Sequence, residues 1–131
     1  MKKVYLAVTP AYHEQEDIVF KYAIYNEQEQ FVQGDVLYHD YRKPVVAGLF
    51  AILELLKVLK EYRSETIEII VNDGALLEQL QGTTDTKNKD VIKVAAFTRN
   101  KFNAFSQDIH VKSIAGQYEE TKVWEEKLSR I

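Results

Sequence analysis

The chain contains no cysteine, and this absence removes several kinds of chemistry at once. Without thiols there can be no disulfide framework, no thiolate metal site and no cysteine nucleophile. The three histidines, His13, His39 and His110, lie far apart without ligand spacing, so a histidine metal site is not expected. The apolar segment from Val4 to Val8 is too short for a signal-peptide core or a membrane span. A soluble, cytoplasmic protein with no membrane partner is the expectation.

An excess of positive charge is also missing. The sequence has 17 lysines and arginines against 20 aspartates and glutamates, which gives a formal net charge of −3. A surface that grips a polyanion over its whole extent is therefore not expected, although there is room for a local basic patch. No repeat, low-complexity tract or linker is evident, and 46% of the 131 residues are apolar. We expect one domain, residues 1–131, with one sizeable core.

Three strands are predicted in the first third of the chain. Residues 3–8 alternate two faces that carry little charge, which is typical of a central strand. The segments Ile18 to Tyr25 and Phe31 to Tyr38 also alternate, and the polar run Asn26 to Glu29 turns the chain between them. The pattern indicates an antiparallel meander.

Helices and strands alternate in the rest of the sequence. Pro44 is placed to open a helix whose apolar residues run nearly all the way round, as in a core helix. Asp90 is predicted to cap a later helix. The expected elements are a helix to Tyr62, a strand from Thr66 to Val71, a short helix to Leu80, a helix to about Phe105, a strand from Ile109 to Ser113 and a closing helix.

Three motifs in this order resemble the type 1 ribonuclease H family. Residues 46–52 (VAGLFAI) resemble the first helix of the family. Residues 72–79 (NDGALLEQ) resemble its Asp-Ser strand end and following helix, and residues 110–116 (HVKSIAG) resemble its late Trp-Val-Lys-Gly-His-Ala-Gly segment. The resemblance covers essentially the whole chain. It implies a ribonuclease H-like α/β fold, with a five-stranded mixed sheet of an antiparallel meander and parallel strands, flanked by helices.

Four carboxylates hold two magnesium ions in active members of that family, and the ions polarise the scissile phosphate and generate the attacking hydroxide. By the resemblance, only Asp73 matches one of the four. The other three positions fall on Thr9, Gly48 and Trp124, and a shift of the first strand by one residue would supply no acid either. The loop histidine that helps the product to leave falls on Ile114. A single carboxylate is a weak magnesium ligand, so the resemblance implies a degenerate site, no catalysis and no cofactor.

Two of these residues also have structural interpretations. An aspartate between a strand and a helix caps the helix, and this is the favoured interpretation of Asp73. Trp124 shares helical spacing with Leu128 and Ile131, which predicts a core face. The alignment adds the hypothesis that the indole fills a vacated metal site with apolar surface.

A basic cluster precedes the last strand and is interleaved with Phe97 and Phe102. In the family this part of the chain can lie near the nucleic acid, where lysines could meet phosphates. The competing interpretation is the solvated face of an amphipathic helix whose phenylalanines point inward. With one lysine from the last motif, the candidate nucleic-acid contacts are Lys87, Lys89, Lys93, Arg99, Lys101 and Lys112.

Three functions follow from these observations. The favoured one is a catalytically inactive ribonuclease H-like domain that binds nucleic acid or a protein. The second is an active, magnesium-dependent ribonuclease H that cleaves RNA in RNA:DNA hybrids through Asp73 and displaced ligands such as Glu14, Glu16 or Asp17. The third is a structural or oligomeric role, in which the tyrosine-rich second and third strands leave Tyr22, Tyr25 or Tyr38 exposed on an outer sheet face.

Overall fold

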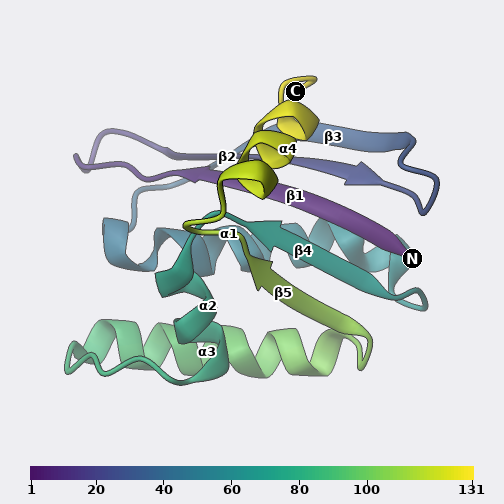
Figure 1. Ribbon diagram of the computed structural model, residues 1–131. Coiled ribbons are helices and arrows are strands. Elements are labelled where there is room, and N and C mark those ends of the chain that lie inside the picture. Colours follow the sequence, from purple (N-terminus) through teal and green to yellow (C-terminus); the bar gives the residue numbers. More distant parts are fainter.

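A five-stranded mixed sheet with strand order β3-β2-β1-β4-β5 organises the chain (Figure 1). The computed structural model describes residues 1–131. β1 pairs antiparallel with β2, β2 pairs antiparallel with β3, and β4 is parallel to both β1 and β5. This topology confirms the predicted meander followed by parallel strands. The strands are β1 (Lys2–Thr9), β2 (Ile18–Tyr25), β3 (Phe31–His39), β4 (Ile67–Val71) and β5 (Ile109–Ser113).

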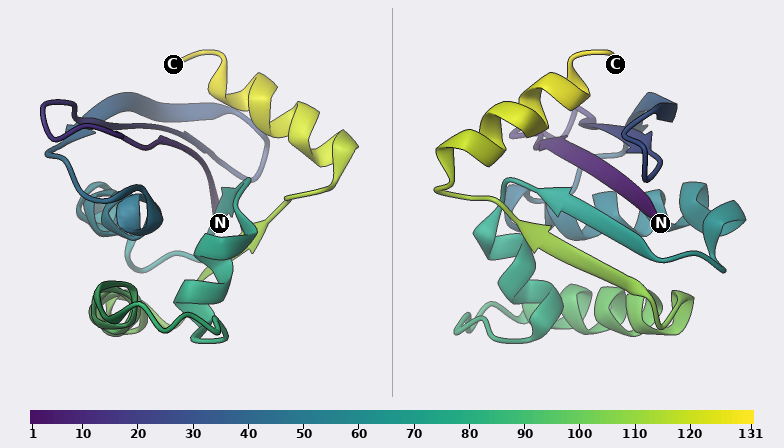
Figure 2. Two further views of the ribbon diagram at one scale, coloured as in Figure 1. Left: turned by 90° about the vertical axis from the view of Figure 1, so that its left-hand side faces the viewer. Right: turned by 45° about the vertical axis from the view of Figure 1, so that its right-hand side comes forward.

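Helices cover both faces of the sheet, but unequally (Figure 2). Three of them lie on one face, which we call the wide face, and one lies on the other, which we call the narrow face. None of the helices has the length and apolar content that a membrane crossing needs. The wide face carries α1 (Pro44–Val58) with its 3₁₀ extension η1 (Leu59–Tyr62), α2 (Gly74–Gln81) and α3 (Lys89–Phe105), and the narrow face carries α4 (Tyr118–Leu128).

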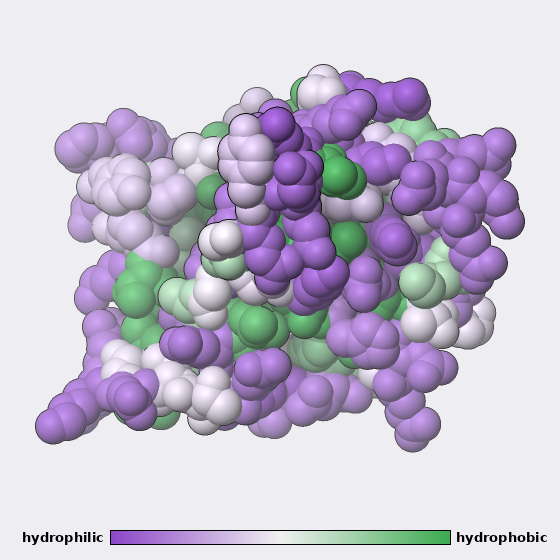
Figure 3. All heavy atoms as spheres, in the orientation of Figure 1, coloured by the Kyte–Doolittle hydropathy of each residue, from purple (hydrophilic) through white to green (hydrophobic).

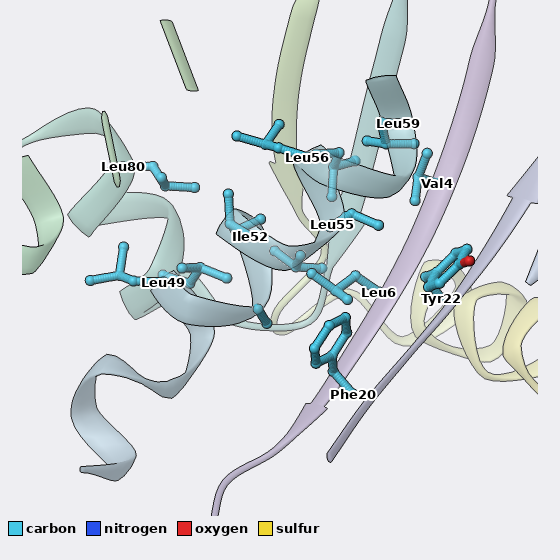
Figure 4. Close-up of a cluster of buried hydrophobic side chains, with 14 of the residues drawn as sticks. Val4, Leu6, Phe20, Tyr22, Leu49, Ile52, Leu55, Leu56, Leu59 and Leu80 are labelled. Atoms are coloured by element: carbon cyan, nitrogen blue, oxygen red, sulfur yellow. The ribbon is translucent and has the colours of Figure 1, made fainter. Parts of the chain in front are cut away.

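The main core lies between the wide face and α1 (Figure 4). Leu49, Ile52 and Leu55 of α1 are fully buried and belong to the same cluster as Leu6 of β1 and Phe20 of β2. The apolar residues of α1 run nearly all the way round because the sheet covers one flank and α3 the next. The predicted core helix is therefore confirmed.

Two details of the helix ends differ from the expectation. The predicted helix to Tyr62 tightens into a 3₁₀ turn at Leu59, as helix ends often do. The predicted cap by Asp90 is wrong, because the Asn88 side-chain oxygen accepts hydrogen bonds from the backbone N–H groups of Asp90 (2.9 Å) and Val91 (3.3 Å). Asp90 then lies in the first turn of α3, where a negative charge is favoured.

The tyrosines of β2 are not available on an outer surface. Tyr22 is 5% exposed because it faces α1, and Tyr25 is 4% exposed because α4 covers it. The Tyr25 hydroxyl donates a hydrogen bond to the Lys127 carbonyl oxygen at 2.9 Å. The prediction of exposed tyrosines is thus wrong for Tyr22 and Tyr25 and right for Tyr38, which is 67% exposed.

Candidate functional site

The strand order places a topological switch point at the carboxyl ends of β1 and β4, and we call this region of the molecule the crevice. β1 pairs with β2 on one side and with β4 on the other, so these two parallel strands meet at a topological switch point. Their pairing ends at Leu6 and Val71. β1 continues to Thr9 against β2 alone, and Asp73 follows the end of β4. In open α/β sheets, ligands bind in the crevice outside the strand ends at such a point. This crevice is therefore the candidate site.

Trp124 of α4 reaches the point where β1 and β4 part. Its Nε1 donates a hydrogen bond to the Leu6 carbonyl oxygen at 3.1 Å, so the indole satisfies a backbone acceptor of the last β1 residue that pairs with β4. The indole is half-buried and packs against the narrow-face cluster beside Ala7. The predicted core role of Trp124 is confirmed. Figure 3 shows hydrophilic residues over the outer surface of α4, with apolar residues visible on either side of it.

Leu76 occupies the space beside Gly48. A Cβ atom added at Gly48 would lie 3.2 Å from both Cδ1 and Cδ2 of Leu76, which is closer than ordinary van der Waals contact. α2 thus fills the volume that a longer side chain on this turn of α1 would need. A carboxylate at Gly48 would have to displace Leu76 or leave the crevice.

Asp73 is the N-cap of α2. Its Oδ1 accepts a hydrogen bond from the Leu76 backbone N–H at 3.1 Å. The predicted capping interpretation is confirmed, because a carboxylate oxygen here satisfies an N–H group that has no partner within the helix. Thr9 and Asp73 are exposed, whereas Ile114 is only 1% exposed and belongs to the narrow-face core.

The donors around the crevice do not suit a pair of magnesium ions. The chain holds no group of three or more histidine, aspartate or glutamate side chains that could bind a metal ion. Glu14, Glu16 and Asp17 are exposed in the loop between β1 and β2 and form no such group with Asp73. Magnesium takes oxygen ligands in near-octahedral geometry and retains its waters unless several carboxylates replace them. The residues present therefore do not fit the two-metal arrangement.

The basic candidates are spread over different parts of the surface. Arg99 is half-buried, and its Nη1 donates a hydrogen bond to the Gln79 carbonyl oxygen near the end of α2 at 2.9 Å. Lys112 pairs with Glu120 of α4 at 3.3 Å. The four remaining candidates are exposed, one in the loop before α3 and three on α3 itself: Lys87, Lys89, Lys93 and Lys101.

A concavity between α1 and α3 was not predicted from the sequence. It has a volume of about 630 Å³, and we call it the α1–α3 groove. One predicted side-chain direction is wrong here: Phe102 packs toward the core, but Phe97 is 54% exposed in the groove. The apolar residues that line the groove are Phe50, Leu53, Leu56, Phe97, Ala104 and Phe105.

Comparison with known proteins identifies the architecture. No protein-family model and no curated protein matches the sequence. Among solved structures, LC11-RNase H1 in complex with an RNA/DNA hybrid is 14% identical with a TM-score of 0.74, covering 99% of this chain and 95% of that chain. RNase H1 from Halobacterium salinarum NRC-1 is 13% identical with a TM-score of 0.73, covering 99% and 98%. The N-terminal RNase H domain of a Mycobacterium tuberculosis protein is 8% identical with a TM-score of 0.67, covering 98% and 91%.

These identities are low, so the likeness concerns the fold. The matches extend over nearly the whole of each chain, and they agree with the strand order and with the helices on both sheet faces. The chain therefore has the ribonuclease H-like fold.

Proposed function

We propose that residues 1–131 form a ribonuclease H-like domain that binds a partner and does not cleave nucleic acid. The observation that carries this proposal is the make-up of the crevice. Asp73 is the one carboxylate at the expected positions, and its Oδ1 is held by the Leu76 N–H. The Leu76 side chain fills the space beside Gly48. The Trp124 indole binds the Leu6 carbonyl oxygen, where the pairing of β1 with β4 ends.

Physical chemistry links this make-up to a loss of hydrolysis. Two-metal hydrolysis needs two cations about 4 Å apart to stabilise the attacking and leaving oxygens. Several carboxylates must crowd together to hold them, and two carboxylates 4 Å apart repel each other by about 4 kcal/mol at an effective dielectric of 20. A chain that places a leucine and a tryptophan here avoids that repulsion and gains packing instead.

Nucleic acid is the first ligand to test, because LC11-RNase H1 has the same fold and was solved with an RNA/DNA hybrid. Four lysines of the predicted set are exposed and form no ion pair: Lys87, Lys89, Lys93 and Lys101. Their phosphate contacts would make binding fall as the salt concentration rises.

The test is incubation of the purified protein with a labelled RNA:DNA hybrid in magnesium and, separately, in manganese. We expect no cleavage by the wild type or by Asp73→Asn, while an active ribonuclease H cuts the same hybrid. Cleavage that disappears in Asp73→Asn would contradict the proposal and would indicate a metal site rebuilt from acids such as Glu14, Glu16 or Asp17. A gel shift of the uncut hybrid at moderate salt then separates nucleic acid from protein as the partner.

A further inference from the structure

The α1–α3 groove has the shape of a seat for a third helix. α1 has 15 residues and α3 has 17, and both are seen nearly end-on in the left view of Figure 2, so their axes run nearly parallel. The stretches that line the groove run from Phe50 to Lys57 and from Phe97 to Phe105, about 10 Å and 12 Å at 1.5 Å per residue, which gives room for about two helical turns. A helix laid between them would contact both.

The floor of the groove is apolar. Leu53 and Phe50 of α1 are only half-buried, and Ala104 of α3 is exposed. Phe97 is the most informative residue, because 54% of this large apolar side chain remains exposed on α3. Burial of apolar surface is favourable, so a partner that covers the Phe97 side chain would gain binding energy there.

The rim of the groove is positively charged, although the whole chain carries −3. Lys57, Lys60, Arg63 and Lys101 surround the apolar floor, and the only acid among the lining residues is Glu54. Glu54 already lies 3.1 Å from the Lys57 Nζ. Lys60 and Lys101 form no ion pair. The rim therefore favours an anionic partner.

Arg63 holds one end of the groove in place. Its Nε and Nη2 donate hydrogen bonds to the carbonyl oxygens of Phe105 and Ala104, which joins the end of η1 to the end of α3. These carbonyls are acceptors that the helix itself leaves unpaired. Because both walls are fixed in the absence of a partner, binding would cost little ordering of the groove.

The aromatic faces favour a peptide over single-stranded nucleic acid. Bases bind by stacking on exposed aromatic rings. The Phe50 ring already has the His39 ring at 5.1 Å and the Arg42 guanidinium at 5.1 Å, and the Phe105 ring has the Arg63 guanidinium at 5.4 Å. Aliphatic side chains need no free ring face, so a peptide suits this lining better than bases do.

We propose that the α1–α3 groove binds an acidic amphipathic helix of a partner protein, with leucine-like anchors on the floor and carboxylates at Lys60 and Lys101. Such a helix presents its anchors at positions i, i+3, i+4 and i+7. The inference names the partner class for the proposed binding role and rests on that role. It places binding away from the crevice at the strand ends.

The probe is a fluorescein-labelled synthetic helix of about 16 residues, with leucine at the four anchor positions and glutamate at the positions that flank the leucine stripe. Two further peptides serve as controls: one with lysine in place of every glutamate, and one with the same residues in scrambled order. Fluorescence anisotropy measures affinity, and amide chemical shifts identify the surface. We expect the acidic helix to bind about tenfold more tightly than either control, with shifts confined to α1, η1 and α3.

Two variants test the groove itself. Lys60→Glu combined with Lys101→Glu should weaken binding by at least about tenfold, since both charges lie at the rim. Phe97→Ala should weaken it by about tenfold through loss of the anchor contact. All three side chains are exposed, so the variants should keep the wild-type circular dichroism and melting temperature. The matched control, Lys122→Glu combined with Arg130→Glu, makes the same charge change outside the groove and should leave binding unchanged.

Equal binding of the acidic and basic helices, no binding, or binding unaffected by the Lys60 and Lys101 variant would overturn the inference. Binding of a thymidine oligonucleotide through these lysines without peptide binding would overturn it too, and would assign the groove to nucleic acid. The nuclease assay reads the crevice through Asp73, whereas this assay reads the groove. Failure of one is therefore distinguishable from failure of the other.

Discussion

The two faces of the sheet differ in the number of buried residues that their helices cover. The wide face has a cluster of 20 buried residues beneath three helices, and the narrow face has six beneath α4 alone. α4 contributes a single buried side chain, Leu128, together with the half-buried Trp124. Most of the burial energy therefore belongs to the wide face. The narrow face, with fewer contacts to lose, is the part of the molecule that can open locally at least cost.

This difference bears on the crevice, because each face closes it from its own side. Leu76 comes from the wide face and Trp124 from the narrow one. The contacts of Leu76 and of Trp124 should consequently contribute different amounts to the free energy of unfolding. Variants on each face can measure that difference.

The largest expected effect is on the wide face. Leu55→Ala should lower the free energy of unfolding by about 3–5 kcal/mol, because Leu55 is fully buried between helix and sheet where the core cannot collapse around a cavity. Leu128→Ala removes the same atoms from the end of α4 and should cost less, about 2 kcal/mol, because α4 can shift inward. Urea denaturation of both variants measures the difference, and equal losses would contradict the comparison.

Restoring an acid on α1 should be costly and should not restore catalysis. Gly48→Glu places a Cβ 3.2 Å from Leu76 and should destabilise the fold by about 1–3 kcal/mol through overpacking. Adding Leu76→Ala should recover part of that loss beyond the sum of the single effects, which a double-mutant cycle measures. Strictly additive losses would show that Leu76 is not the obstacle.

On the narrow face, Trp124→Phe tests the hydrogen bond to the strand. Phenylalanine keeps the apolar contact but leaves the Leu6 carbonyl oxygen without its donor, so we expect a loss of about 1–2 kcal/mol. Chemical denaturation followed by circular dichroism gives the value. A loss near zero would mean that water replaces the indole N–H, and the Trp124 hydrogen bond would then stabilise the narrow face less than we infer.

Asp73 caps α2, and two substitutions separate the effect of capping from the effect of charge. Asp73→Ala should cost about 1 kcal/mol, because the Leu76 N–H loses its acceptor. Asp73→Asn should cost much less, because asparagine caps a helix about as well as aspartate. Thermal melts of both variants distinguish these outcomes, and a large effect of the asparagine variant would point to a role for the charge itself.

The smallest effect concerns alkaline pH and compares one tyrosine from each face. Burial raises the pKa of Tyr5 on the narrow face, with the charges of Glu29 and Glu68 adding to it, and burial also raises the pKa of Tyr22 on the wide face. Unfolded tyrosines ionise near 10.0, before the folded ones. The stabilisation is complete below that pH and is lost as the pH rises through the folded pKa values. Urea midpoints should fall above about pH 10, and Tyr5→Phe and Tyr22→Phe should each reduce the fall.

The sequence predicts those features that short stretches of residues determine. Alternation predicts the first three strands and β-branched residues predict β4, and Asp73 is recognisable as a cap because capping involves residues three apart. The cap of α3 was misplaced because Asn88 precedes Asp90, and both residue types can cap a helix. Local patterns cannot distinguish two candidates only two residues apart.

Features that depend on contacts between distant residues could not be predicted from local sequence patterns. The hydrogen bond from Trp124 to Leu6 joins residues 118 apart, and the fit of Leu76 beside Gly48 depends on how α1 meets α2. The burial of Tyr25 depends on the position of α4. The groove had one available signal, because Phe97 shares its helix with Lys93 and Lys101, but only the packing of α1 beside α3 shows that the phenylalanine faces outward.

Trp124 is the only tryptophan in the chain, and it stands at the parting of β1 and β4. Its intrinsic fluorescence therefore reports on the environment of the crevice. A ligand that displaces the indole should shift the emission to the red by exposing it to water. A ligand that settles between α1 and α3 should leave the emission unchanged, so one spectrum taken during a titration reports where the ligand has bound.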